Sequence, residues 1–129
     1  ERTTICFVGD GGFLMAGNEL ATALQYDLKP IYLVINNSMF GTIRMHQERE
    51  YPGREVATEL RNPDFAAYAQ SFGAHGEIVE RSEDFAPALE RALAADKVAV
   101  LELRTDPEAI TTRTTLTAIR EAAEARQKA

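Results

Sequence analysis

Apolar residues along this chain occur mostly in short runs that alternate with stretches of helical periodicity. Four of the runs each predict a β-strand, and they span residues 4–8, 31–35, 75–79 and 98–103. Between successive strands, helical periodicity and helix-start signals predict four helices, at 13–26, 40–49, 63–72 and 82–94. This alternation predicts an α/β fold of three layers, in which a mostly parallel sheet carries helices on both faces.

Turn and capping residues set the expected boundaries of these elements. A glycine-rich turn is predicted at 9–12, ahead of the first helix. Asn62 is expected to cap the third helix, because a proline follows it at the first helical position, where the missing N–H costs nothing. Gly73 should end that helix, and Ser82 should cap the next one. The polar loop at 50–61 is long enough to form a lid.

The last part of the chain, residues 111–129, has a helical composition with a thin apolar stripe. We expect this tail to pack on a neighbour or to fray. The 129 residues are 45% hydrophobic, which suffices for a single domain spanning 1–129. The first residue is Glu1 and a strand follows almost at once, so we expect a fragment of a longer chain, truncated at its N-terminal side.

Composition and charge exclude several classes of partner. No run approaches the roughly 18 apolar residues of a membrane helix, and the chain start does not resemble a signal peptide, so a cytoplasmic protein is expected. The net charge of −6 argues against binding nucleic acid. It also argues against binding a diphosphate without an accompanying cation. Cys6 lies in an apolar run and is expected to be a buried small residue.

Two polar clusters follow the first two predicted strands. Gly9-Asp10-Gly11 ends the first run, and Asn36-Asn37 ends the second. In open α/β sheets the carboxyl ends of the strands form the edge where ligands bind. Glycines at 9, 11 and 12 free the backbone for unusual dihedrals and close approach of a ligand, and the helix start that follows favours a phosphate.

Asp10 would repel such a phosphate unless a divalent cation lay between them. Magnesium takes about six oxygen ligands, and Asp10, the amide oxygen of Asn37, a carbonyl, a water and two phosphate oxygens meet that number. Each cluster taken alone is also compatible with an ordinary turn or strand end. Nucleotide motifs fit less well, because position 14 is leucine where a dinucleotide site needs glycine, and a P-loop lysine is missing.

The sequence around these clusters is similar to the signature of thiamine diphosphate-dependent enzymes. The similarity rests on Gly9-Asp10-Gly11 followed after 24 residues by Asn36-Asn37, and it extends through Gly-Asp-Gly-Gly-Phe-Leu-Met and the segment 18–23. Residues 36–44, Asn-Asn-Ser-Met-Phe-Gly-Thr-Ile-Arg, further resemble the acetolactate synthase group. The resemblance covers roughly residues 5–103 and implies the C-terminal diphosphate-binding domain of such an enzyme.

The resemblance implies a role for each matching residue. Mg²⁺ would be bound by the side chains of Asp10 and Asn37 and by the carbonyl of Met39. Thr42 would lie near the thiazolium ring of the cofactor. The diphosphate would lie against Gly9, Gly11, Gly12 and Gly41. Gly11, Gly12 and Gly41 would offer it their main-chain N–H groups.

The implied activity is decarboxylation or carboligation of a 2-oxo acid such as pyruvate, hence a transferase or lyase. In this family a glutamate of a pyrimidine-binding domain, usually on another subunit, activates the cofactor, so a homodimer or homotetramer is implied. The fragment alone is expected to anchor cofactor without turnover. Another 2-oxo acid decarboxylase or carboligase of the superfamily, or a non-catalytic binding or assembly module, are the alternatives.

Remaining polar residues allow a functional and a structural interpretation. His46 follows the binding segment and is a candidate for contact with the substrate, or else part of an ordinary polar helix face. Arg54 and Arg61 are candidates for steering a carboxylate, although loop arginines are usually solvated. Glu19 and His75 are expected to be structural.

Overall fold

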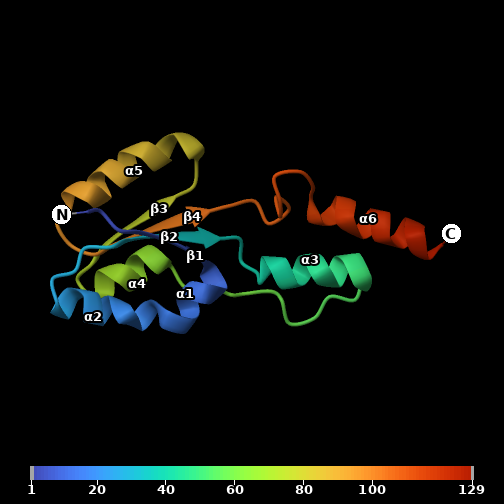
Figure 1. Ribbon diagram of the computed structural model, residues 1–129, viewed down its shortest axis with the longest axis horizontal. Coiled ribbons are helices and arrows are strands. Elements are labelled where there is room, and N and C mark those ends of the chain that lie inside the picture. Colours follow the sequence, from blue (N-terminus) through green and yellow to red (C-terminus); the bar gives the residue numbers. More distant parts are fainter. Residues whose placement is uncertain (1, 129) are drawn as a thin grey trace. The chain divides into compact units, whose positions relative to one another are not determined.

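A computed structural model describes residues 2–128 (Figure 1), and these divide into two compact units. The first unit comprises the chain up to Asn36 together with Asn62–Arg104, and the second comprises Asn37–Arg61 together with the chain from Thr105 onward. The expectation of a single domain over 1–129 stays a prediction. None of the helices in residues 2–128 is long and apolar enough to cross a membrane.

The first unit is built on a four-stranded parallel sheet. The strands are β1 (Ile5–Gly9), β2 (Ile31–Asn36), β3 (His75–Val79) and β4 (Ala99–Arg104), in the spatial order β1-β2-β4-β3. In register, β1 begins opposite β2, and both β2 and β3 begin opposite Ala99 of β4. All four predicted strands are therefore present, each within one residue of its predicted ends. Because the strands are parallel, their carboxyl ends meet at one edge.

Helices cover both faces of this sheet, which confirms the three-layer prediction (Figure 1). On one face lie α1 (Asp10–Ala16), a 3₁₀ turn η1 (Gly17–Glu19), α2 (Leu20–Gln25) and α4 (Phe65–Ser71), while α5 (Ser82–Ala94) covers the other face. Each face has its own apolar core. On the α1/α4 side the rings of Phe13 and Phe65 meet edge to face. The larger buried side chains of this core are Phe13, Leu20, Val34, Phe65 and Val100. The α5 side buries Ile31, Leu33, Ala88, Ala92 and Leu101.

The start of the first helix differs from the prediction. Residues 10–12, predicted as part of a turn, form the first turn of α1, with Gly9 as its extended N-cap residue. Glycine disfavours helix locally, but burial of Phe13 in the core favours the helical path, and tertiary packing overrides the propensity. The glycines here do not take left-handed dihedrals, since positive φ values occur instead at Gly53 and Gly73 among the described glycines.

The predicted caps of two further helices are wrong. Asp64, not Asn62, is the N-cap residue of α4, where its side chain accepts a hydrogen bond from the N–H of Ala67 at 2.8 Å. Ser82 is the first residue of α5 and does not cap it. Both helices exist as predicted, and Gly73 follows the end of α4 with a φ of +89°. The local pattern thus predicts the helices, while a neighbouring carboxylate takes over the cap of α4.

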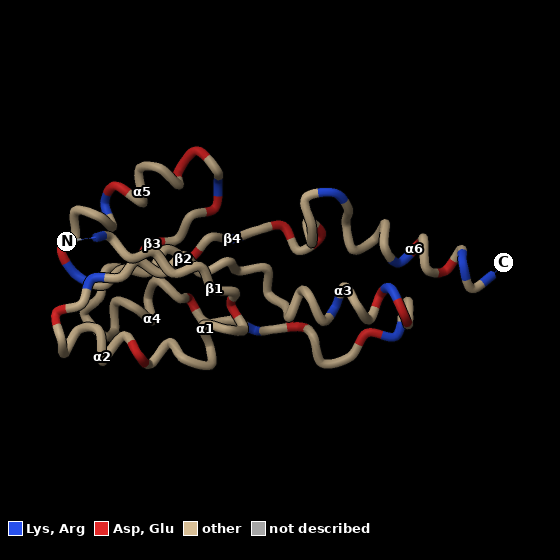
Figure 2. Tube along the Cα trace, viewed as in Figure 1, with Lys and Arg blue, Asp and Glu red and all other residues tan. Residues whose placement is uncertain are grey.

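The second unit pairs two helices from distant parts of the sequence. They are α3 (Gly41–Glu50) and α6 (Leu116–Gln127), which pack against each other (Figure 1). Leu116 and Ala123 of α6 are buried, so this part of the tail packs on a neighbouring helix, as one of the two expectations has it. Basic and acidic positions are interspersed along both helices (Figure 2). An ion pair between Arg120 of α6 and Glu48 of α3 supplements the thin apolar stripe that the sequence shows.

Candidate functional site

The carboxyl ends of β1, β2 and β4 carry a connected set of polar side chains in the first unit. Asp10, directly after β1, is 3% exposed, and Glu102 in β4 is 1% exposed. Asn36 ends β2 and is also buried. Asn62, which precedes α4, links the set, because its Nδ2 donates to Oδ2 of Asp10 at 2.7 Å and to Oδ1 of Asn36 at 2.8 Å. We call these four residues the strand-end network.

The direction of every hydrogen bond in the strand-end network follows from its two carboxylates. A carboxylate accepts and cannot donate, so the amide nitrogens must face Asp10 and Glu102. Accordingly, Nδ2 of Asn36 donates to Oε1 of Glu102 at 2.9 Å, and its Oδ1 is left to accept from Asn62. The N–H of Gly11 donates to Oδ1 of Asp10 at 2.9 Å. The network fixes the orientation of both amides at the edge of the sheet.

Two features of this network fit a divalent cation. Asp10 is a buried carboxylate that receives only N–H groups, and no Lys or Arg among residues 2–128 forms an ion pair with it. The Oδ1 of Asn62 is buried and lacks a hydrogen-bond partner in the described structure. An uncompensated buried charge and an orphaned acceptor are both costly. Hard oxygen donors of this kind suit Mg²⁺.

Within residues 2–128 there is no group of three or more His, Cys, Asp or Glu side chains suited to a metal. The predicted set is of a different type, because Asp10 is its single carboxylate and the rest are amide, carbonyl, water and phosphate oxygens. The predicted cofactor residues fall in both units, with Gly9, Asp10, Gly11 and Gly12 in the first and Asn37, Met39, Gly41 and Thr42 in the second. Their convergence on one ligand stays a prediction.

In the second unit, the segment after β2 folds into a tight polar turn. The N–H of Met39 donates to Oδ1 of Asn37 at 3.2 Å, and Ser38 between them has a left-handed φ of 57°. The N–H of Gly41 donates to the carbonyl of Met39 at 2.9 Å. Both oxygens keep a second lone pair for a cation. The N–H of Gly41, by contrast, is engaged within the turn and would have to be shared with a diphosphate.

Gly41 is also a position where a side chain would not fit. A Cβ atom there would lie 2.8 Å from both Nδ2 of Asn37 and Cδ1 of Ile110. The glycine therefore keeps the turn compact around the predicted ligand Asn37. At Gly12 a Cβ would lie 3.2 Å from Cγ2 of Val8, whereas nothing lies within 4 Å of a Cβ at Gly9.

Helix α3 separates its predicted site residues from a buried charged face. Thr42 and His46 are four residues apart, so they share one face of the helix, and both are exposed. On another face Arg44 and Glu48 are buried, and Nε of Arg44 donates to Oε1 of Glu48 at 2.9 Å. The polar residues around His46 therefore do not form one solvated helix face, because Arg44 and Glu48 are buried. His46 shares an exposed face with Thr42, and its contact with a substrate stays a prediction.

Glu48 binds a second guanidinium, supplied by Arg120 of α6. Nε of Arg120 lies 2.8 Å from Oε2 of Glu48, and its Nη2 also contacts Oε1. Hydrogen bonds from Arg120 and Arg44 outweigh the effect of burial and lower the pKa of Glu48 to about 2. We call Arg44, Glu48 and Arg120 the helix-pair charge cluster. It joins α6 to α3 through the contact between Arg120 and Glu48.

The loop between α3 and α4 is tied down within the second unit. Gln47 exchanges two hydrogen bonds with the backbone of Val56, at 2.9 and 3.0 Å. Met39 and Glu59 form an antiparallel bridge, flanked by backbone hydrogen bonds. Arg54 lies over the ring of Tyr51, with its guanidinium carbon 5.8 Å from the ring centre. The predicted loop is present, and its action as a lid stays a prediction.

Sequence reasoning missed several residues of these clusters. Asn62 was interpreted as a helix cap, and its true partners lie 26 and 52 residues away. Arg120 lies 72 residues from Glu48. Glu102 gave a usable signal, because it is the one charged residue inside the apolar run 98–103. Such a residue requires polar partners when the strand is buried.

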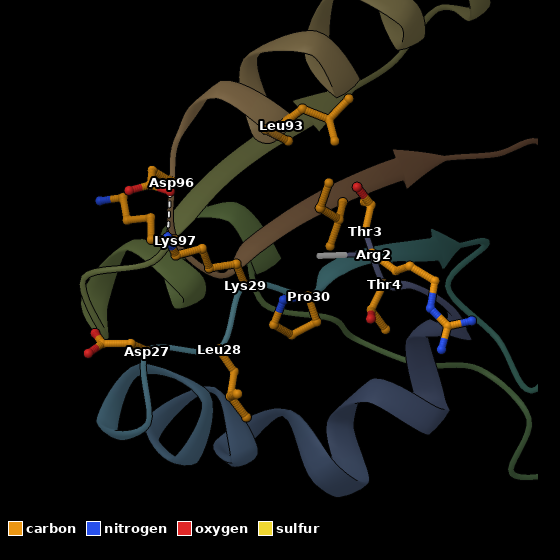
Figure 3. A pocket seen from close by; sticks show the side chains of 12 residues that line it. Arg2, Thr3, Thr4, Asp27, Leu28, Lys29, Pro30, Leu93, Asp96 and Lys97 are labelled. Atoms are coloured by element: carbon orange, nitrogen blue, oxygen red, sulfur yellow. Dashed lines mark hydrogen bonds and ion pairs between the residues drawn. The ribbon is translucent and has the colours of Figure 1, made fainter.

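A hollow of about 450 Å³ lies at the opposite edge of the sheet (Figure 3). It is lined by residues that precede the strands, including Thr4, Pro30 and Lys97. Lys29 and Asp96 form an ion pair at its wall. None of the predicted cofactor residues lines it, so the hollow is separate from the strand-end network.

A family model and several curated proteins match most of the chain. Residues 1–103 match the family described as thiamine pyrophosphate enzyme, C-terminal TPP binding domain. Sulfoacetaldehyde acetyltransferase from Castellaniella defragrans is 34% identical over 107 residues, covering 80% of this chain and 18% of that protein. The large subunit of acetolactate synthase isozyme 3 from Escherichia coli K12 is 33% identical over 94 residues, covering 72% of this chain and 16% of that protein.

A solved structure shares both fold and sequence with the chain. The thiamine diphosphate-dependent 4-hydroxybenzoylformate decarboxylase of Rhodococcus jostii RHA1 superposes with a TM-score of 0.76 at 30% identity, over 82% of this chain and 20% of that one. The chain thus spans about a fifth of the length of the proteins that it matches. By sequence and by fold, the chain belongs to the thiamine pyrophosphate-dependent enzymes, as their C-terminal TPP-binding domain.

Proposed function

We propose that this domain binds the diphosphate of thiamine diphosphate through Mg²⁺, within an acetolactate synthase-like enzyme that decarboxylates or ligates 2-oxo acids. The observation that carries the proposal is Asp10, a buried carboxylate at the ligand-binding edge of the sheet that lacks a cationic partner in the described structure. A divalent cation supplies the missing charge and lets a diphosphate approach an acidic domain.

Each predicted residue takes one role in this proposal. Asp10 and Asn37 bind Mg²⁺ through side-chain oxygens, and Met39 binds it through its carbonyl. Gly11, Gly12 and Gly41 approach the diphosphate with their backbone, and Gly9 leaves space at the end of β1. The exposed space above Gly9 and the compact turn at Gly41 support these roles.

The bound cofactor supplies an electron sink for cleavage of the bond next to a 2-oxo group. Thr42 would lie near the thiazolium ring, and His46 shares its face of α3, which makes His46 a candidate for contact with the substrate. Pyruvate is the proposed substrate. A pyrimidine-binding domain of another subunit completes the site in a cytoplasmic homodimer or homotetramer.

A decarboxylase without carboligation is the second candidate, and the likeness to 4-hydroxybenzoylformate decarboxylase favours it. An acetyltransferase is the third, because sulfoacetaldehyde acetyltransferase is among the relatives. Incubation of the full-length protein with pyruvate separates the first two. With pyruvate, acetolactate indicates the first function and acetaldehyde alone indicates the second. The third is tested with sulfoacetaldehyde and inorganic phosphate, where acetyl phosphate forms as sulfite leaves.

Isothermal titration of the full-length protein with thiamine diphosphate, with and without Mg²⁺, tests the cofactor assignment. We expect binding that depends on Mg²⁺, and we expect Asp10→Ala to abolish that dependence. Glu121→Ala is the matched control, because it removes an exposed carboxylate from α6. Wild-type binding that is equally tight without a divalent cation would contradict the proposal.

A further inference from the structure

We propose that Asn62 is the positioning residue of the cation site, holding the carboxylate of Asp10 and the amide of Asn36 in place through a single nitrogen. This inference rests on the proposed function, because it assigns to Asn62 a part in binding Mg²⁺. It concerns a residue that the sequence pattern presents as a helix cap, and its two side-chain hydrogen-bond partners lie within the first unit.

The geometry gives Asn62 no role in α4. The cap of that helix is Asp64, whose Oδ1 accepts from the N–H of Ala67. Both hydrogens of the Asn62 amide point instead to the strand ends, at 2.7 Å from Oδ2 of Asp10 and 2.8 Å from Oδ1 of Asn36. Asn62 therefore joins the end of β1 to the end of β2.

The direction of these bonds makes the arrangement selective for an amide donor at position 62. Oδ1 of Asn36 needs a donor, because the nitrogen of Asn36 is committed to Glu102. Oδ2 of Asp10 needs a donor as well, since its other oxygen is bound by the N–H of Gly11. One NH₂ group satisfies both acceptors at once.

Holding Asp10 from both sides leaves its remaining lone pairs in a fixed direction. A ligand carboxylate that is oriented in advance loses less conformational freedom when a cation binds. The Oδ1 of the same Asn62 amide is buried and has no hydrogen-bond partner in the described structure, so it has an unmet need for a donor such as a water. Asn36, next to the predicted ligand Asn37, is held by the same contact.

The test is a calorimetric titration of the full-length protein with Mg²⁺, at a fixed, saturating concentration of thiamine diphosphate. Two variants are compared with wild type, Asn62→Leu, which keeps the volume, and Asn62→Ala. We expect the dissociation constant for Mg²⁺ to rise by about 10- to 100-fold in both, as for the loss of other outer-shell partners. We also expect full cofactor stoichiometry to return at high Mg²⁺.

The return of stoichiometry at high Mg²⁺ distinguishes positioning from folding, because a merely structural lesion is not repaired by the cation. Gln25→Leu and Gln25→Ala are the matched controls, since Gln25 is an exposed amide at the end of α2. A dissociation constant within twofold of wild type in both Asn62 variants would overturn the inference. Loss of the folded state, or binding that high Mg²⁺ does not restore, would overturn it as well.

The outcome for wild type separates this inference from the function on which it rests. If wild type binds thiamine diphosphate with Mg²⁺ dependence and the Asn62 variants do so equally well, only the role of Asn62 fails. If wild type shows no such dependence, the proposed function fails and the role of Asn62 fails with it.

Discussion

The two units bury carboxylates in opposite ways. Glu48 in the second unit is fully buried and receives two guanidinium groups, so its charge is balanced inside the chain. Asp10 in the first unit is almost as buried but receives only an amide and a backbone N–H. Burial of a carboxylate therefore does not by itself indicate a role in binding a ligand. The source of the neutralising charge distinguishes an acid that holds helices together from one suited to an external cation.

The largest loss of stability should come from removing the charge of Glu48, the carboxylate that is balanced inside the chain. Glu48→Gln removes the negative charge and leaves the guanidinium of Arg44 buried without its main counter-charge. Breaking a buried ion pair in this way typically costs about 3–5 kcal/mol of stability. Urea unfolding should show a loss of this size, and a loss below about 1 kcal/mol would mean that the helix-pair charge cluster contributes little.

The pH dependence of stability sharpens the same contrast. The folded pKa of Glu48 is about 2, below its ordinary value of 4.5, so the folded state favours the ionised form. Its contribution is complete above about pH 4.5 and is lost as the pH falls through the folded value, by up to about 3 kcal/mol. Unfolding curves between pH 5 and pH 2 should show this loss in wild type. The slope should be much shallower in Glu48→Gln.

Alanine substitutions of glycine compare the two units at their predicted ligand contacts. Gly41→Ala places a Cβ 2.8 Å from Asn37 and Ile110, so the turn must shift, at about 1–3 kcal/mol. Gly9→Ala meets nothing within 4 Å, and stability should change by less than about 0.5 kcal/mol. Thermal unfolding measures both. Equal melting temperatures for the two variants would show that the turn at Gly41 adapts freely.

The smallest change in stability is expected from removing the charge of Asp10, measured without Mg²⁺. Asp10→Asn removes a buried charge that no protein cation balances, and this gain offsets the loss of one hydrogen bond, which is worth about 1 kcal/mol. Stability without Mg²⁺ should therefore stay within about 1 kcal/mol of wild type. A loss as large as that of Glu48→Gln would show that the charge of Asp10 is already balanced in the apo protein.

Local sequence signals predicted the layers of the fold because strand-like segments alternate with helical ones along the chain. The strand β3 was predicted with its observed ends, and α5 likewise spans its predicted residues. Errors occurred where a residue had two compatible local roles. Residues 10–12 are typical of a turn by composition, yet they begin α1 because Phe13 packs in the core.

The sequence predicted the site residues that belong to a motif. It did not predict the residues whose side chains hold those motif residues in place. Asp10 follows an apolar strand, so its place at the sheet edge was evident. Asn62 is preceded by a loop and followed by proline, and both local features indicate a helix start. Its real contacts depend on the spatial order of the strands, which puts β2 beside both β1 and β4. No local pattern contains that order.

Pro63, which follows Asn62, has a consequence for the unfolded chain. Its ring restricts the preceding residue to extended conformations, so Asn62 samples fewer backbone states before folding. The entropy lost when Asn62 is fixed at the strand ends is correspondingly smaller. The proline that suggested a helix start thus lowers the entropic cost of assembling the polar edge of the sheet.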